Sequence, residues 1–128
     1  MATKINVTRC AKRNDATALS SVTCNSATAG AAQDYTLTFD GADDHSGIIV
    51  HNAGTKDITV KLSDADGCGA VKNKALNVYS GSYVLIPIES GRCAKNGIVT
   101  LTVTPESGSA LSACQVTVMG FVTGIVTK

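Results

Sequence analysis

The side chains able to bind metals or to transfer protons are few and scattered in this chain. The two histidines, His45 and His51, are separated by Gly47 and do not have the spacing of two ligands on one helix face. Asp43 and Asp44 precede His45, and an exposed acidic loop explains these three residues more simply than a metal site does. The sequence therefore predicts no metal site at the histidines.

The carboxylates form neither a calcium loop nor a catalytic pair. Asp64 and Asp66 begin a run like that of a calcium loop, but Gly67 comes too early and no glutamate closes the loop at the twelfth position. Glu89 and Glu106 stand beside predicted turns, without a partner carboxylate. A nucleophile elbow, a phosphate-binding glycine loop and a dinucleotide fingerprint are all absent from the sequence. We expect no catalytic residue and no cofactor, and predict that the chain is not an enzyme.

Cysteines are the remaining reactive groups. They are odd in number, and none forms a C-x-x-C pair, which disfavours a zinc site and a redox motif. They stand at Cys10, Cys24, Cys68, Cys93 and Cys114. The N-terminal residues do not form an export signal, so we expect reduced, partly buried thiols, with a disulfide framework as the alternative.

Length and charge narrow the classes of partner. A chain of 128 residues is expected to form one domain with a single core. Eleven basic residues against ten acidic ones give a net charge of +1, and the longest basic run is Lys12-Arg13. This balance disfavours a nucleic-acid partner. Nowhere do 18 apolar residues follow one another, so no membrane-spanning helix is expected either.

The elements that carry these residues are predicted to be strands, because apolar residues recur with a period of two. Alternating segments predict strands near residues 5–8, 35–39, 76–78, 98–103 and 114–121, whereas 14–32 looks like an extended arm or long loop. Residues 47–62 are interpreted as a β-hairpin around Asn52-Ala53-Gly54. The run from Tyr83 to Ile88 is apolar on both faces, which favours a central strand with Pro87 at its end or at a bulge.

These elements predict an all-β fold, a single antiparallel β-sandwich or jelly-roll-like domain with an extended N-terminal arm. Residues 1–32 would form the N-terminal strand and arm, and residues 33–128 the β-sandwich domain, within one structural domain overall. The core is expected to be aliphatic, since only five aromatic residues are present and none is a tryptophan. The predicted core residues are Ile49, Ile58, Val60, Leu85, Val99, Leu101, Val116 and Val118.

Two stretches carry a resemblance to a known family. They are IIVHNAGTKDITVKL and, further along, YSGSYVLIPIESGRCAKNGIVTLTVT. An apolar strand ending in an Asn-Ala-Gly turn, a Glu89-Ser90-Gly91-Arg92 segment and an Asn96-Gly97 turn into the last strands resemble the pattern of small head decoration proteins of tailed bacteriophages. The resemblance spans about residues 47–121, and the five cysteines with the Gly-Cys-Gly at 67–69 depart from it.

The resemblance implies a function and partners. A capsid decoration, or cement, protein would bind the major capsid protein on the outer surface of the virion, associate with copies of itself as a homotrimer, and be made in the cytoplasm of the host bacterium. The alternative is a phage tail, fibre or other surface-displayed β-sandwich that binds a receptor or carbohydrate. That class would need exposed aromatic side chains, and two of the tyrosines Tyr35, Tyr79 and Tyr83 are near enough to predicted strands to be core.

Overall fold

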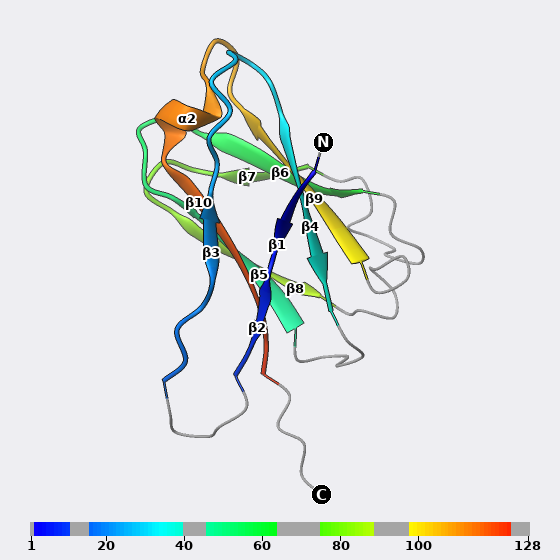
Figure 1. Ribbon diagram of the computed structural model, residues 1–128. Coiled ribbons are helices and arrows are strands. Elements are labelled where there is room, and N and C mark those ends of the chain that lie inside the picture. The colour runs from blue at the N-terminus through cyan, green and yellow to red at the C-terminus, as the bar shows by residue number, and fades with distance from the viewer. Residues whose placement is uncertain (1, 11–15, 40–45, 64–74, 89–97, 124–128) are drawn as a thin grey trace, which may run out of the picture.

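The computed structural model describes residues 2–10, 16–39, 46–63, 75–88 and 98–123, and these residues are folded mainly as strands (Figure 1). The strands are β1 (Thr3–Ile5), β2 (Val7–Arg9), β3 (Ser21–Thr23), β4 (Gln33–Thr38), β5 (Ser46–Asn52), β6 (Ile58–Ser63), β7 (Ala75–Val78), β8 (Tyr83–Ile88), β9 (Ile98–Pro105) and β10 (Val116–Val122). One short helix, α2 (Leu111–Cys114), precedes β10. No helix in the described ranges has the length and hydropathy needed to cross a membrane.

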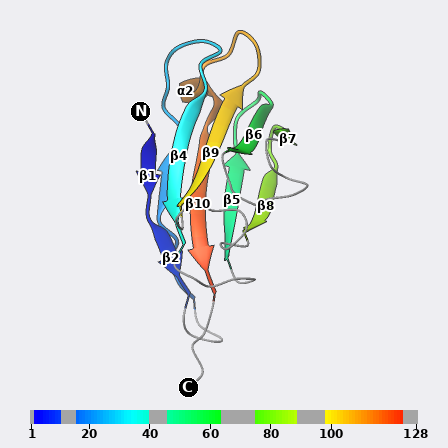
Figure 2. The ribbon, with the colours of Figure 1, turned by 90° about the vertical axis from the view of Figure 1, so that its right-hand side faces the viewer.

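The strands form two sheets that pack face to face (Figure 2), which confirms the predicted all-β sandwich. Sheet A has the order β1-β4-β9-β6-β7, and sheet B has the order β2-β10-β5-β8, with β3 also paired to β10. Most neighbours are antiparallel, but β1 pairs with β4 and β2 pairs with β10 in parallel. The sheets are therefore mixed, and both parallel pairs come from the N-terminal residues.

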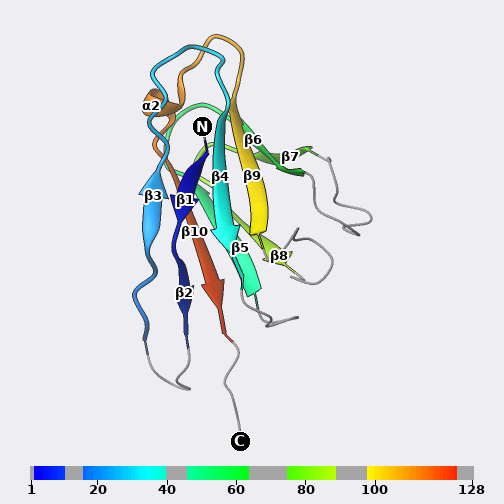
Figure 3. The ribbon, with the colours of Figure 1, turned by 45° about the vertical axis from the view of Figure 1, so that its right-hand side comes forward.

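The N-terminal region contributes strands to both sheets. β1 lies in sheet A and β2 in sheet B, so the chain changes sheets at Asn6 (Figure 3). β3 follows and pairs with the first half of β10, in antiparallel register, while β2 pairs with the second half. Cys24, just after β3, is buried in the core. The described part of the predicted arm thus lies along the edges of the sandwich.

The predicted hairpin over residues 47–62 is wrong. β5 pairs with β10 and β8 in sheet B, whereas β6 pairs with β7 and β9 in sheet A. Each strand has one strongly apolar face, and crossing between the sheets lets both faces bury against each other across the core. The Asn52-Ala53-Gly54 segment is therefore a corner between two sheets.

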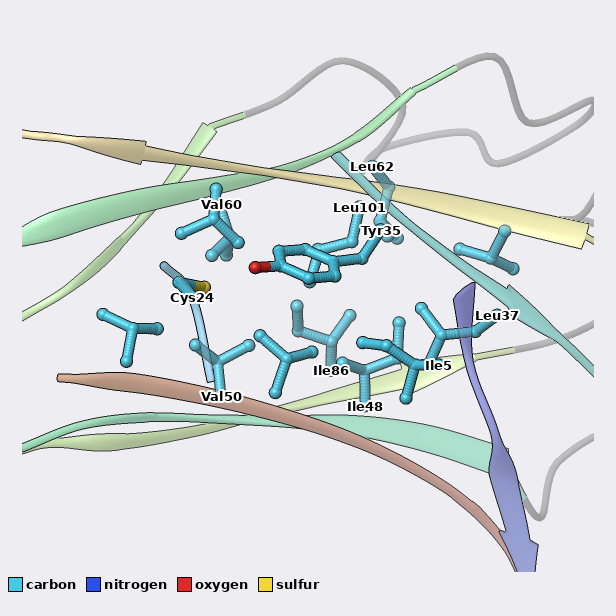
Figure 4. Close-up of a cluster of buried hydrophobic side chains, with 14 of the residues drawn as sticks. Ile5, Cys24, Tyr35, Leu37, Ile48, Val50, Val60, Leu62, Ile86 and Leu101 are labelled. Atoms are coloured by element: carbon cyan, nitrogen blue, oxygen red, sulfur yellow. The ribbon is translucent and has the colours of Figure 1, made fainter. Parts of the chain in front are cut away.

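The core between the sheets is mostly aliphatic (Figure 4). Six of the predicted core residues are buried there: Ile58, Val60, Val99, Leu101, Val116 and Val118. The predictions for Ile49 and Leu85 are wrong, since Ile49 is half-buried and Leu85 is 56% exposed. Successive side chains alternate across a sheet, so the core instead receives residues of the opposite side of these two strands, Ile48 and Val50 of β5 and Ile86 and Ile88 of β8.

β8 is not the central strand that its apolar run predicted. Within the described residues it pairs with β5 alone, at the edge of sheet B. Pro87 is compatible with this place because a proline in an edge strand need not break a ladder hydrogen bond. One apolar side of β8 therefore covers the core, and the other side faces outward.

Candidate functional site

Most of the polar candidates from the sequence lie outside the described residues. These are Asp43, Asp44, His45, Asp64, Asp66, Gly67 and Glu89, with Cys68, Cys93 and the segments 89–92 and 96–97. His51 and Glu106 are described: His51 lies in β5 of sheet B, and Glu106 directly follows β9 of sheet A. In the ranges that the structure describes, no three His, Cys, Asp or Glu side chains come together in a way that could hold a metal ion.

The three described cysteines are free thiols, as predicted. Cys10 is half-buried, and Cys24 and Cys114 are buried. Burial raises the pKa of both buried thiols, because an apolar environment disfavours the thiolate. The Cys114 thiol also donates a hydrogen bond to the carbonyl oxygen of Ala110 at 3.3 Å. These two cysteines are therefore poor nucleophiles and act as small core side chains.

Tyr35 is the largest fully buried side chain and lies between the sheets. Its hydroxyl points toward the sulfur of Cys24 (Figure 4) but has no hydrogen-bond partner among the described residues. Burial raises its pKa far above the usual range for tyrosine. The hydroxyl has no solvent access, so this pair contributes packing and offers no surface for a ligand.

The strongest candidate for a functional site is the outer face of sheet B. Strand register places its side chains in three rows across β8, β5 and β10: Tyr83, His51 and Thr117; Leu85, Ile49 and Met119; Pro87, Gly47 and Phe121. The face continues over neutral residues of β2 and β3, namely Thr8, Ser21 and Thr23. Tyr83 is 68% exposed and Leu85 56%. No Asp, Glu, Lys or Arg occupies these register positions, so the face is neutral and mainly apolar.

Gly47 determines how the apolar side chains of this face lie. A Cβ placed on Gly47 would be 2.8 Å from Cζ of Phe121 and 3.2 Å from Cδ1 of Leu85. The space that a larger residue would occupy is thus filled from both sides, by the ring of β10 and the leucine of β8. Glycine at the second position of β5 allows these two side chains to lie over the strand and form one continuous apolar surface.

His51 and Tyr83 form the other end of the face. Their rings stack with centroids 3.8 Å apart and planes 3° from parallel. They stand opposite each other on β5 and β8, as cross-strand neighbours. Because His51 supports the inner side of the tyrosine ring, Tyr83 presents its opposite side to solvent as a fixed, flat surface.

Asn52 positions this part of β8. Its side chain is fully buried, and its Nδ2 donates to the carbonyl oxygens of Lys56 at 2.7 Å and Val78 at 3.1 Å. Its Oδ1 accepts from the amide of Gly54 at 3.1 Å, and its own amide donates to the carbonyl oxygen of Ser82 at 3.0 Å. One residue thus ties the β5–β6 corner to the β7–β8 turn and fixes where Tyr83 begins its strand.

A hollow at one end of sheet A is a weaker candidate. Its volume is about 160 Å³, and its lining includes Asp57, Asn77, Thr104 and Glu106. Both carboxylates already accept hydrogen bonds from backbone amides. The amide of Asp57 donates to Glu106 Oε1 at 3.1 Å, and the amide of Ser80 donates to Asp57 Oδ1 at 2.9 Å. The hollow holds no aromatic side chain, and its acidic groups are explained by the turns that they stabilise.

The sequence contains a pattern that corresponds to the outer face of sheet B. The run from Tyr83 to Ile88 is apolar on both sides of a strand, a pattern that predicts a central strand. An edge strand with an uncovered apolar face has the same pattern. The sequence pattern alone does not distinguish a central strand from an edge strand of this kind.

Comparison with known proteins adds no relative. No protein-family model, no curated protein and no solved structure matches the chain. The geometry of the described residues is therefore the main ground for a functional conclusion.

Proposed function

We propose that this chain is a non-enzymatic structural protein that binds other protein subunits through the outer face of sheet B. The observation that carries the proposal is the exposure of Leu85 and Tyr83 on a face whose described positions hold no charged residue. Contiguous exposed apolar surface is rare on proteins that act alone and marks interaction sites. Tyrosine, methionine and phenylalanine, which are enriched at the centres of interfaces, all occur on this face.

The resemblance in sequence gives the partner of this proposal. We propose the major capsid protein of a tailed bacteriophage, on the outer surface of the virion, where the bound chain would stabilise the head. The resemblance also implies that copies of the chain associate with one another as a trimer. Many copies on a lattice can hold it firmly even when each contact is weak, because attachment through several sites raises the effective concentration.

The mainly apolar, neutral face indicates which interactions would supply the free energy of binding. A neutral interface gains its stability from removing apolar surface from water, with little contribution from charge pairs. Binding to the capsid should therefore change little between low and moderate salt concentration. A strong loss of binding in salt would contradict a mainly apolar contact.

The test is to mix the purified protein with phage heads stripped of it, and to measure co-sedimentation and the temperature of DNA release. The wild type should sediment with the heads and raise that temperature. Met119→Lys puts a charge at the centre of the outer face of sheet B and should abolish binding. Thr100→Lys makes the same change on the outer face of sheet A and should leave binding intact. If the folded wild type neither sediments with heads nor raises the temperature, the proposal is wrong.

A second candidate function has its own observation. Tyr79 and Tyr83 are 59% and 68% exposed, whereas Tyr35 is the buried tyrosine, so the expectation of two core tyrosines is wrong. Exposed rings, one of them stacked on His51, suit a tail, fibre or surface-displayed module that binds a carbohydrate or receptor. Glycan-array binding that Tyr83→Ala abolishes would support this function, and absence of glycan binding together with binding to heads would exclude it.

A further inference from the structure

Among the described strands β8 pairs with β5 alone, and the residues on its other edge can be assigned one by one. The amide of Asn52 donates to the carbonyl oxygen of Ser82, and the amide of Ala53 donates to that of Gln115, so alternate residues of β5 bond to β8 and to β10. In an antiparallel ladder this alternation continues along the register. Val84, Ile86 and Ile88 therefore turn their main-chain groups toward β5. Tyr83, Leu85 and Pro87 turn theirs away from it, to the open edge of sheet B.

The other edge strands of the described sandwich are poor sites for pairing with another chain. β1, β2 and β3 have three residues each, and β7 has four. β1 and β2 also carry Lys4 and Arg9, and charged residues on an edge oppose pairing. β8 has six residues and no charge, and its one protective feature is Pro87, which offers no amide donor.

We infer that β8 pairs in antiparallel orientation with β8 of a second copy of this chain, about a two-fold axis at Val84. This register places Tyr83 of each copy opposite Leu85 of the other. Each of these two pairs can exchange both main-chain hydrogen bonds, because no described strand pairs with the edge-facing amides and carbonyls of Tyr83 and Leu85. Pro87 then falls outside the paired residues. An axis at Leu85 would instead oppose Pro87 to Tyr83, and because Pro87 has no amide donor, the carbonyl oxygen of Tyr83 would stay unpaired in each half. The first register is therefore favoured, because it pairs every amide and carbonyl of the opposed residues.

The chemistry of β8 favours a second copy as the occupant of this edge. A neutral strand meets its own copy without repulsion between like charges. The Tyr83 ring of one copy lies beside the Leu85 side chain of the other on the outer face, and aromatic–aliphatic pairs of this kind stabilise strand pairing. The two sheets B become one continuous sheet, and the two apolar outer faces become one larger surface. A two-fold axis gives an isologous pair, in place of the trimer that the sequence resemblance implies.

The inference rests on the proposed function in that the joined face is the one proposed to bind the capsid. The two can be separated by measuring mass in solution by sedimentation equilibrium and head binding by co-sedimentation, on the same preparations. The wild type is expected to be a dimer at high concentration. Leu85→Lys puts charges close together across the axis and should raise the dimer dissociation constant about 100-fold. Met119→Lys, on a strand inside the sheet, should leave the dimer intact and abolish head binding.

Amide hydrogen exchange read by NMR gives a second test, and it does not depend on a variant. In a monomer, the amides of Val84 and Ile86 are protected by β5, and those of Tyr83 and Leu85 exchange freely. In the dimer, Tyr83 and Leu85 should become protected as the protein concentration rises. A wild type that stays monomeric or forms trimers, or a dimer in which these two amides stay unprotected, would overturn the inference. A monomer that binds heads would leave the proposed function standing, and a dimer that does not bind them would leave the inference standing alone.

Discussion

The two outer faces of the sandwich are built on the same strand geometry and differ in chemistry. Half of the described residues on the outer face of sheet A are threonines, and most of the others are charged or amide residues: Lys4, Asp34, Thr36, Thr38, Thr59, Lys61, Ala75, Asn77, Ile98, Thr100, Thr102 and Thr104. Thr102 Oγ1 even donates to Asp34 Oδ1 across that face at 2.7 Å. The outer face of sheet B has mainly apolar residues on β8, β5 and β10 and no Asp, Glu, Lys or Arg at its described register positions.

This difference shows which outer face is stable in contact with water and which gains stability from being covered. A face of threonines and charges satisfies its polar groups with water and needs no cover. A face with Leu85, Phe121 and Met119 keeps apolar surface in water at a cost of about 25 cal/mol for each Å². Both faces belong to one sandwich with one core, so folding does not require the second to be apolar. The asymmetry instead suits a protein that binds others through one side.

The largest expected effect separates two leucines that look alike in the sequence. Leu101 is fully buried in sheet A, and Leu85 is 56% exposed in sheet B. Leu101→Ala should lower the free energy of unfolding by about 2 to 5 kcal/mol through loss of burial and a residual cavity. Leu85→Ala should change it by less than about 0.5 kcal/mol in the monomer. Urea unfolding of both variants checks this, and equal losses would mean that Leu85 is a core residue.

Removing the side chain that fixes the corner between the sheets should have the next largest effect. Asn52→Ala leaves the carbonyl oxygens of Lys56 and Val78 and the amide of Gly54 without their partner. Since unsatisfied buried groups are costly, we expect a loss of about 2 to 3 kcal/mol in unfolding free energy. Ser80→Ala, which removes an exposed hydrogen bond from the β7–β8 turn to Gly54, is the matched control and should lose less than about 1 kcal/mol. Similar losses in the two variants would remove Asn52 from its role at the corner.

Alkaline pH should lower the free energy of unfolding, because two ionisable side chains are buried between the sheets. The pKa values of Cys24 and Tyr35 are raised in the folded protein by burial, from ordinary values of 9.0 and 10.0. Above about pH 9 the unfolded chain loses these protons while the folded chain keeps them, so stability is present at neutral pH and falls as pH rises, by up to about 1.4 kcal/mol per pH unit for each group. Thermal unfolding across this range should show a smaller fall for Tyr35→Phe. A fall of unchanged steepness in that variant would assign the effect to other groups.

The smallest effect is expected on the outer face of sheet A. Thr102→Val removes the hydrogen bond to Asp34 and places one apolar side chain among the threonines. Valine suits a strand as well as threonine does, and exposed hydrogen bonds contribute little, so unfolding free energy should change by less than about 1 kcal/mol. Head binding should stay as in the wild type. Reduced head binding by this variant would show that the polar face also contacts the partner and would break the contrast between the faces.

Much of the fold follows from the period-two pattern. Val99, Leu101 and Val103 alternate with threonines, so a strand places all three on one side, where they are buried. The corner at residues 52–54 could not be predicted in the same way. Its Asn-Ala-Gly residues suit a hairpin turn as well as a crossing between sheets, and a partner that decides between them, the carbonyl oxygen of Val78, lies far along the chain.

The sequence by itself determined that this chain forms strands, that they pack as a sandwich with an aliphatic core, and that two strands are apolar on both sides. Only the tertiary structure decided that Ile48 faces the core while Ile49 faces outward, and that β8 lies at an edge. The reason is physical. Alternation fixes which residues share a side of a strand, but which side is buried depends on what packs against it. A strand that is apolar on both sides has the same sequence pattern whether its second side is covered by this chain or by another protein.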